Sequence, residues 1–357
     1  MGNKQPNTRL LDAIAHRPVD RTPVWIMRQA GRYLPEYRRV RKKAGDFLTL
    51  CKTPELACEV TLQPVERYSL DAAIIFSDIL TIPDAMGLGL DFAENQGPFF
   101  NHPIRSEKQA AALNLPDGET LDYVAEAVRL VCRALDGRIP LIGFTGSPWT
   151  LATYMVEGKG AHNFSLVKKM MLDYPDIFKS MLELLATAGG LYLASQAKAG
   201  CRCVMVFDSW GGVLTSEHYL QYSLTPMKKL ITVFKDQGYS DVPIILFTKG
   251  GGLWLEAIAK TGCQAIGLDW TVNIGEAKHR VGKHVALQGN LDPAILLASK
   301  QAVITETRRV LRAFGGDSGH IFNLGHGIYP STNPDHLQVL IETVQNYSSG
   351  HNENTAE

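Results

Sequence analysis

The chain has 357 residues, of which 45% are hydrophobic and 20% charged, a balance typical of globular proteins with a large core. Basic and acidic residues number 36 each, so the overall charge does not indicate a nucleic-acid-binding surface. We expect no secretion signal, no membrane span, and either one large α/β domain or two ordinary ones.

The cysteine pattern predicts free thiols and no structural metal. There are six cysteines, and none of them shows CxxC or zinc-finger spacing. Such usage suits a reducing cytoplasm, where buried free cysteines are common. The cysteines are Cys51, Cys58, Cys132, Cys201, Cys203 and Cys263.

The first predicted strand, residues 22–27, is followed by a cationic segment. Seven basic residues and one acidic residue occur between Arg28 and Lys43. This local positive charge in a neutral chain predicts a pocket for an anionic small molecule. Arg28 and Arg32 are the candidates, because Gly31 lets the backbone bend between them and arginine binds carboxylates through paired hydrogen bonds. The later basic residues are interpreted as solvated.

Seven further apolar runs follow in chain order. Most are hydrophobic at nearly every position and do not alternate with polar residues, which is typical of parallel strands buried on both faces. They cover residues 72–78, 140–146, 203–209, 242–248, 265–271, 285–290 and 320–327. Helices are predicted from starts at Thr53-Pro54 and Ser147-Pro148, and over residues 176–198, 216–235, 252–260, 301–314 and 334–347.

Eight strands alternating with helices predict a single (β/α)8 TIM barrel. The barrel should cover about residues 10–347 of one domain that spans residues 1–357, with frayed ends at 1–8 and 348–357. The long segment 87–104 predicts a loop or hairpin insertion at the barrel mouth. A doubly wound sheet is the alternative, but no GxGxxG motif follows the first strand.

Polar residues recur where the predicted strands end, which is where TIM barrels place their active sites. Each has a structural alternative: Asp78 could cap a helix, Ser209 could form a turn, and His326 could occupy a turn between glycines. The KGGG sequence at 249–252 could hold a phosphate, but a plain loop is the preferred interpretation. The set comprises Arg28, Asp78, Ser209, Thr248, Asp269, Asn290 and His326.

Two long segments closely resemble the uroporphyrinogen decarboxylase family: WIMRQAGRYLPEYR at 25–38 and GFTGSPWTLATYMVEG at 143–158. Shorter segments around Asp78 and at 207–212, 287–293 and 323–328 are similar as well. The resemblance covers nearly the whole chain. It implies a (β/α)8 barrel, a cytoplasmic homodimer, no cofactor, and removal of carbon dioxide from the four acetate side chains of uroporphyrinogen to give coproporphyrinogen.

The resemblance also implies roles for individual residues. Asp78 would stabilise a cationic pyrrole and accept its N–H groups, a task suited to a fixed carboxylate. Tyr154 is equally explained by periodicity as a core residue, and its role depends on the resemblance. The expected catalytic residues are Asp78, Arg28 and Tyr154, and the expected substrate-binding residues are Arg28, Gln29, Ala30, Gly31, Arg32, Asp78, Tyr154, Ser209 and His326.

The proton donor remains open among His326, water and a substrate carboxylic acid, because arginine is a reluctant acid. Two rival functions fit the sequence less well. A zinc-dependent methyltransferase would need adjacent thiolate and imidazole ligands, and no His-x-Cys sequence occurs. A non-catalytic tetrapyrrole carrier gives no reason for Asp78, since a buried carboxylate is costly.

Overall fold

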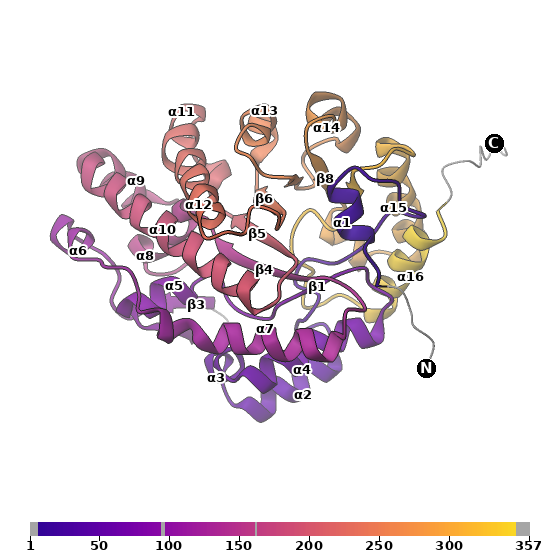
Figure 1. Ribbon diagram of the computed structural model, residues 1–357, viewed down its shortest axis with the longest axis horizontal. Helices are drawn as coiled ribbons and strands as arrows, with labels where there is room; N and C mark the ends of the chain where they lie inside the picture. The colour runs from indigo at the N-terminus through magenta and orange to yellow at the C-terminus, as the bar shows by residue number, and fades with distance from the viewer. Residues whose placement is uncertain (1–5, 94–96, 161–162, 348–357) are drawn as a thin grey trace.

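A computed structural model describes residues 6–93, 97–160 and 163–347 (Figure 1). The predicted frayed C-terminus, 348–357, lies outside the described residues, as do residues 1–5. Residues 6–8 are partly fixed: the Asn7 backbone N–H donates to the Arg138 carbonyl at 3.1 Å, and the Thr8 hydroxyl donates to Asp12 at 2.5 Å.

The centre of the fold is a curled parallel sheet of seven strands in the order β1-β4-β5-β6-β7-β8-β9. Its strands are buried throughout, as their continuous apolar sequences predict. Seven of the eight predicted strands are thereby confirmed. The strands are β1 Ala73–Ile74, β4 Leu141–Gly146, β5 Cys203–Asp208, β6 Ile244–Thr248, β7 Ala265–Gly267, β8 Ala286–Gln288 and β9 His320–Ile321.

The eighth predicted strand, residues 22–27, forms only a single parallel bridge, between Val24 and Phe322. The Phe322 N–H donates to the Pro23 carbonyl at 2.8 Å, on the β9 side. On the β1 side, the Asp71 N–H donates to the Val24 carbonyl at 2.9 Å. The segment therefore hydrogen-bonds toward both outer strands of the sheet without meeting the criteria of a regular strand.

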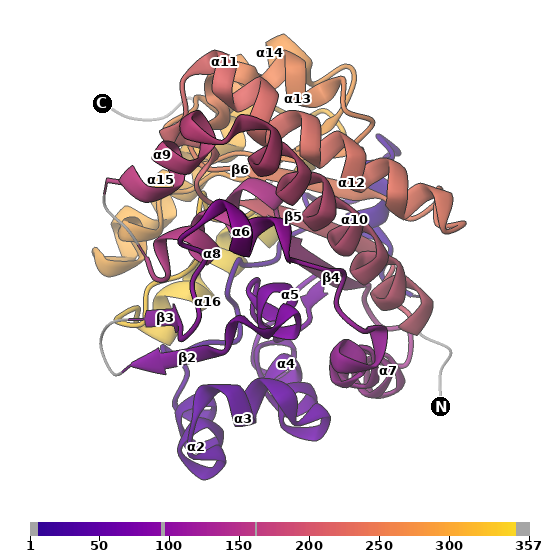
Figure 2. The same ribbon diagram turned by 90° about the vertical axis from the view of Figure 1, so that its left-hand side faces the viewer.

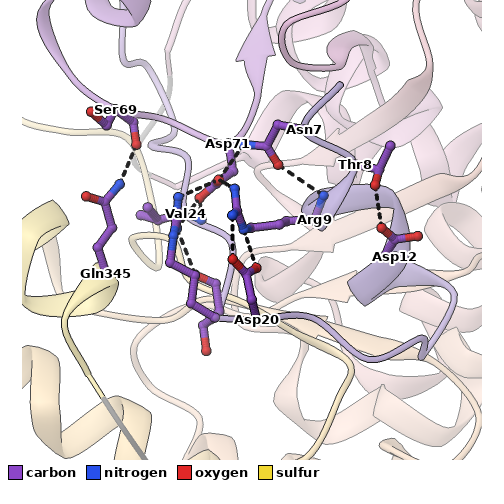
Figure 3. A network of polar contacts seen from close by, with 11 residues as sticks. Asn7, Thr8, Arg9, Asp12, Asp20, Val24, Ser69, Asp71 and Gln345 are labelled. Atoms are coloured by element: carbon purple, nitrogen blue, oxygen red, sulfur yellow. Dashed lines mark hydrogen bonds and ion pairs between the residues drawn. The ribbon is translucent and has the colours of Figure 1, made fainter. Parts of the chain in front are cut away.

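A buried polar network holds this segment in place (Figure 3). The Asp71 carboxylate has no exposed surface and accepts from Arg21 at 2.7 and 2.8 Å. It also accepts from the Asn7 side chain at 2.7 Å and from the Val24 N–H at 2.9 Å. Arg9 lies 3.5 Å from the same carboxylate and pairs with Asp20. Asn7, Arg21 and Val24 are thus attached to the segment that leads into β1.

Helices surround the sheet (Figure 1). Residues 216–235, predicted as one helix, form α11, a π turn at Tyr219–Leu224 and α12. Residues 252–260 form a 3-10 turn at Gly251–Trp254 followed by α13. The helices are α1 Arg9–Ile14, α2 Pro35–Ala44, α3 Phe47–Lys52, α4 Pro54–Arg67, α5 Thr81–Pro83, α6 Glu107–Ala111, α7 Asp122–Leu135, α8 Pro148–Glu157, α9 Ser165–Asp173, α10 Pro175–Ala199, α11 Ser216–His218, α12 Thr225–Asp236, α13 Leu255–Ala259, α14 Ile274–Val281, α15 Lys300–Phe314 and α16 Pro334–Gln345.

The two predicted helix starts behave differently. Ser147 caps α8, because its hydroxyl accepts from the Thr150 N–H at 3.0 Å. Thr53 precedes α4 as predicted, but its side chain makes no cap. Its hydroxyl instead donates to the Thr49 carbonyl at 2.7 Å, since Thr53 also ends α3. The sequence therefore predicts the start of α4 correctly, but the N-cap that a threonine before proline suggests is not formed.

The predicted insertion contains a β-hairpin made of β2 Leu90–Ala93 and β3 Gly97–Phe100. It lies between α3 and α8 (Figure 2), and the Phe92 and Phe47 rings are 4.3 Å apart. The turn of the hairpin, residues 94–96, is outside the described residues. The six cysteines are all free, as predicted, and four of them are buried.

One helix, α10, is long and apolar enough to cross a membrane, contrary to the expectation that no such segment exists. However, 61% of its most apolar window is buried inside the molecule. The helix packs against α12, α8 and β4. Its apolar composition is therefore explained by its place in the core.

Candidate active site

The polar residues predicted at the strand ends gather at one edge of the sheet, because all seven strands are parallel. These residues differ in whether their polar groups already have partners in the protein. Some carry charges that no described residue pairs with, and others are fully used in holding the loops together. This division separates candidate substrate contacts from structural residues.

Arg28 has a left-handed backbone, with φ of 65°, and its side chain is exposed. The sharp bend predicted at Gly31 therefore occurs at Arg28. A positive φ at a non-glycine residue costs about 1–3 kcal/mol and is typical of functional sites. Glycine is still favoured at position 31, because a Cβ there would lie 3.1 Å from the Arg28 carbonyl oxygen, which is a tight contact.

Gly327 explains where the Arg28 side chain lies. A Cβ at Gly327 would be 2.7 Å from Arg28 Nε, so a side chain there would displace Arg28. The Ile328 N–H donates to the Met27 carbonyl at 3.0 Å and fixes the two segments together. Arg28 thus crosses directly over the loop that carries His326. Among the described residues no carboxylate pairs with Arg28 or with exposed Arg32.

Gln29 is buried, and its amide is already engaged. Its carbonyl oxygen accepts from the Ile26 N–H at 3.2 Å, and its amide nitrogen donates to the Ala72 carbonyl at 3.4 Å. Ala30 beside it is partly buried. Gln29 therefore braces the arginine turn against β1, and a direct substrate contact for Gln29 or Ala30 stays a prediction.

Asp78 is partly buried and follows β1. Its carboxylate accepts from the Leu80 N–H at 2.8 Å, a local bond of the kind expected for a capping aspartate. Burial raises the pKa of Asp78, while the Leu80 N–H and the positive charge of Arg28 oppose that rise. The position of Asp78 therefore disfavours its charged form, and no cation of the described chain is paired with it.

Tyr154 lies on α8, partly buried, with its ring 6.2 Å from that of Trp210. Burial raises the pKa of the Tyr154 phenol, and the negative charge of Asp78 adds to this effect. Arg28 acts in the opposite direction. Tyr154, Asp78 and Arg28 are therefore within electrostatic range of one another, as the predicted site requires.

His326 lies between the rings of Phe247 and Trp270, whose centroids are 6.0 and 6.5 Å from the imidazole. Burial lowers the pKa of His326 to about 3, and the positive charges of Arg28 and Lys249 lower it further. The imidazole is therefore neutral near pH 7. It can donate or accept a hydrogen bond, but it carries no proton to give as imidazolium.

Three strand-end residues have structural partners. The Thr248 hydroxyl bonds with Tyr219 at 3.0 Å and donates to Asp208 at 3.3 Å. Asp269 accepts from the Thr271 N–H at 2.8 Å and from the Gly250 N–H, so its carboxylate occupies the KGGG loop. The Asn290 side chain donates to the Asp269 carbonyl at 2.8 Å.

Sequence reasoning missed Asp208, the last residue of β5. Its fully buried carboxylate accepts hydroxyl bonds from Ser147 at 2.6 Å, Ser223 at 2.7 Å and Thr150 at 3.0 Å. Burial raises the pKa of Asp208, and these hydroxyls oppose the rise. The network positions the loop that carries Ser209, which is partly buried beside it. The available signal was an aspartate ending an apolar run.

The residues that the structure describes contain no group of three His, Cys, Asp or Glu side chains arranged to hold a metal ion. The arrangement offers guanidinium groups for anions, a carboxylate without an ion-pair partner, a neutral imidazole and a phenol. Such a set can bind an acidic molecule and stabilise a positive charge that develops on it.

The chain is similar to known proteins over nearly its whole length. The family model for uroporphyrinogen decarboxylase (URO-D) matches residues 5–347. Similar proteins include uroporphyrinogen decarboxylase from Nitrosococcus oceani, 57% identical over 96% of both chains, and that from Thioalkalivibrio sulfidiphilus, 58% identical over 96% of this chain and 98% of its own.

Solved structures show the same fold at low identity. A methyltransferase from Methanosarcina mazei has a TM-score of 0.80 at 20% identity, covering 95% of this chain and 98% of its own. A putative vitamin-B12-independent methionine synthase from Listeria monocytogenes has a TM-score of 0.56 at 14% identity, covering 91% and 95%. These two support the architecture alone. The family model and the high identities settle the relationship: the chain belongs to the uroporphyrinogen decarboxylase family.

Proposed function

We propose that the chain removes carbon dioxide from the four acetate side chains of uroporphyrinogen III, leaving methyl groups and giving coproporphyrinogen III. The observation that carries this proposal is Asp78: a partly buried carboxylate without an ion-pair partner among the described residues, within electrostatic range of Arg28 and Tyr154. Family membership supports the substrate, because the relatives bear that name.

The substrate supplies its own electron sink. Protonation of a pyrrole carbon beside the acetate makes the ring cationic, and the bond to the carboxylate then breaks with its electron pair moving into the ring. A second protonation, at the freed carbon, completes the methyl group, and the ring loses the proton it first gained. Asp78 stabilises the cationic ring and accepts its N–H groups, an interaction stronger in the transition state than in the ground state.

The remaining candidates bind the substrate. Arg28 and Arg32 hold carboxylates, because no described acid neutralises them. Tyr154 and Ser209 donate hydrogen bonds, and His326 binds as a neutral imidazole. The low pKa of His326 opposes a role as proton donor near pH 7, which leaves water or a substrate carboxylic acid.

We propose that the chain is one domain in which residues 22–27 act as the eighth strand and close the barrel. The bonds from Phe322 to Pro23 and from Asp71 to Val24 support this arrangement. The β2–β3 hairpin would be an insertion at the carboxyl end of the strands. A cytoplasmic homodimer that works without a cofactor follows from the family resemblance.

The test is turnover of uroporphyrinogen under reducing, anaerobic conditions, with the number of product carboxyl groups read by chromatography. The proposal expects products with seven down to four carboxyl groups. Unchanged substrate that binds tightly would indicate a carrier, and a thiol-dependent methyl transfer would indicate a methyltransferase.

A further inference from the structure

Lys249 is a cation at the strand ends that the proposed function does not use. It is the first residue after β6 and is partly buried. Its ammonium lies 5.8 Å from the centre of the Trp270 ring and 6.0 Å from that of Trp210. No ion pair to Lys249 is found within residues 6–93, 97–160 and 163–347.

The backbone of Lys249 is fixed on both sides. Its N–H donates to the Asp208 carbonyl at 3.1 Å, and its carbonyl accepts from the Gly212 N–H at 3.0 Å. A Cβ on Gly212 would overlap that carbonyl, so a glycine is required there. The backbone of Lys249 is thus fixed, and its ammonium lies near two aromatic rings that contribute cation–π stabilisation without neutralising its charge.

Lys249 lies away from Asp78. In the sheet, β4 and β5 separate β1, which precedes Asp78, from β6, which precedes Lys249. The positive charges of Arg28 and Lys249 both lower the pKa of His326. The charges that shift the pKa of Asp78 are those of Arg28 and Asp84. His326 therefore stands between two cationic positions, and only the one at Arg28 acts on Asp78.

We propose that Lys249, held between Trp210 and Trp270, binds a substrate carboxylate on the side of the macrocycle opposite the pyrrole that reacts beside Asp78. This inference depends on the proposed function, because it requires a substrate with carboxylates around its rim. Lys249 is not among the charges that act on Asp78, which are those of Arg28 and Asp84. It can therefore attract a substrate carboxylate without adding to the positive charge near the reacting pyrrole.

The position predicts a distinct kinetic effect. A contact far from the reacting ring is equally strong in the ground state and the transition state, so its loss raises KM and leaves kcat nearly unchanged. Removing a hydrogen bond to a charged group of this kind corresponds to about a tenfold rise in KM. Replacing Asp78 should instead lower kcat and leave KM nearly unchanged.

The experiment compares Lys249→Met with Lys249→Arg and with Lys229→Met, a matched loss of one exposed lysine on α12. We expect KM for uroporphyrinogen to rise about tenfold in Lys249→Met, to recover partly in Lys249→Arg, and to stay at the wild-type value in Lys229→Met. Binding of the non-reacting probe uroporphyrin, followed by fluorescence, should weaken by a similar factor and depend less steeply on salt.

Parallel titration with coproporphyrin identifies the carboxylate: weakening of both probes indicates a propionate, and weakening of uroporphyrin alone indicates an acetate. A normal KM in Lys249→Met, or a loss of kcat with KM unchanged, would overturn the inference while wild-type turnover preserves the proposed function. Far-UV circular dichroism and thermal midpoints establish that each variant is folded. Absence of turnover in the wild type would instead remove the proposed function itself.

Discussion

Two aspartates at opposite ends of β1 have opposite surroundings. Asp71, before the strand, is fully buried, and Arg21, Asn7 and the Val24 N–H satisfy its oxygens (Figure 3). Asp78, after the strand, accepts the Leu80 N–H and has no ion pair within the part of the chain that is described. A charge matched by its own protein stabilises the fold, whereas a charge left unmatched is available to a substrate.

The same difference extends to the cations. Arg9 and Arg21 pair with carboxylates at the start of the sheet. Arg28 and Lys249, at the other end, have no such partner among the described residues. The charged residues at one end of the sheet therefore stabilise the fold, and those at the other end are available to bind a substrate.

The largest expected effect is on stability and comes from disrupting the paired charges around Asp71. Asp71→Asn leaves Arg21 partly buried without its anion, and we expect unfolding free energy to fall by about 3–5 kcal/mol. Urea denaturation followed by circular dichroism measures the loss. The folded fraction should keep its kcat, and a stability equal to wild type would show that the network is not structural.

At the unmatched end, Asp78→Asn should reduce kcat about 100–1,000-fold while leaving the fold and much of the substrate affinity intact. Asn accepts hydrogen bonds but has no charge to stabilise the cationic ring. Asp78→Glu keeps the charge and should retain more activity, with partly decarboxylated products accumulating. If Asp78 only caps the following turn, Asn would substitute well and turnover would survive.

Arg28→Lys and Arg32→Lys separate charge from geometry in the same region. Lysine keeps the positive charge but cannot donate two parallel hydrogen bonds to a carboxylate. We expect uroporphyrin to bind about tenfold more weakly to each variant. Lys229→Arg, on an exposed face of α12, provides the control, and wild-type affinity in both site variants would remove the assignment.

The smallest expected effect is on pH dependence. The folded pKa of His326, about 3, is below the ordinary value of 6.5, so the unfolded chain binds more protons between these values. The stability contributed by neutral His326 is complete above about pH 6.5 and declines as the pH falls toward 3. Between about pH 7 and pH 5, wild type should therefore lose more stability than His326→Gln in urea denaturation. Parallel losses in both proteins would contradict the neutral, enclosed imidazole.

The sheet and much of the candidate site could be predicted because their signals are local. Continuous apolar runs identify buried strands, and parallel strands bring the residues at their ends together. Asp78 and His326 were identified in this way as candidates at the strand ends. The confirmed part is the parallel α/β sheet and the family.

Other features depend on contacts that the sequence does not display. Asp208 is satisfied by hydroxyls 15 to 61 residues away, and no local pattern reveals such pairings. The bend predicted at Gly31 occurs at Arg28, whose side chain packs over Gly327, a residue almost 300 positions away in the sequence. Thr53 fails to cap for a similar reason, since the preceding helix competes for its hydroxyl.

The two partners of residues 22–27 become available at very different times during synthesis. Asp71 emerges from the ribosome soon after Arg9, Arg21 and Val24, so the polar network can form while most of the chain is unmade. Phe322, the partner on the other side, is added near the end. We expect the network to hold this apolar segment beside the first strand until then, which would limit its pairing with other nascent chains.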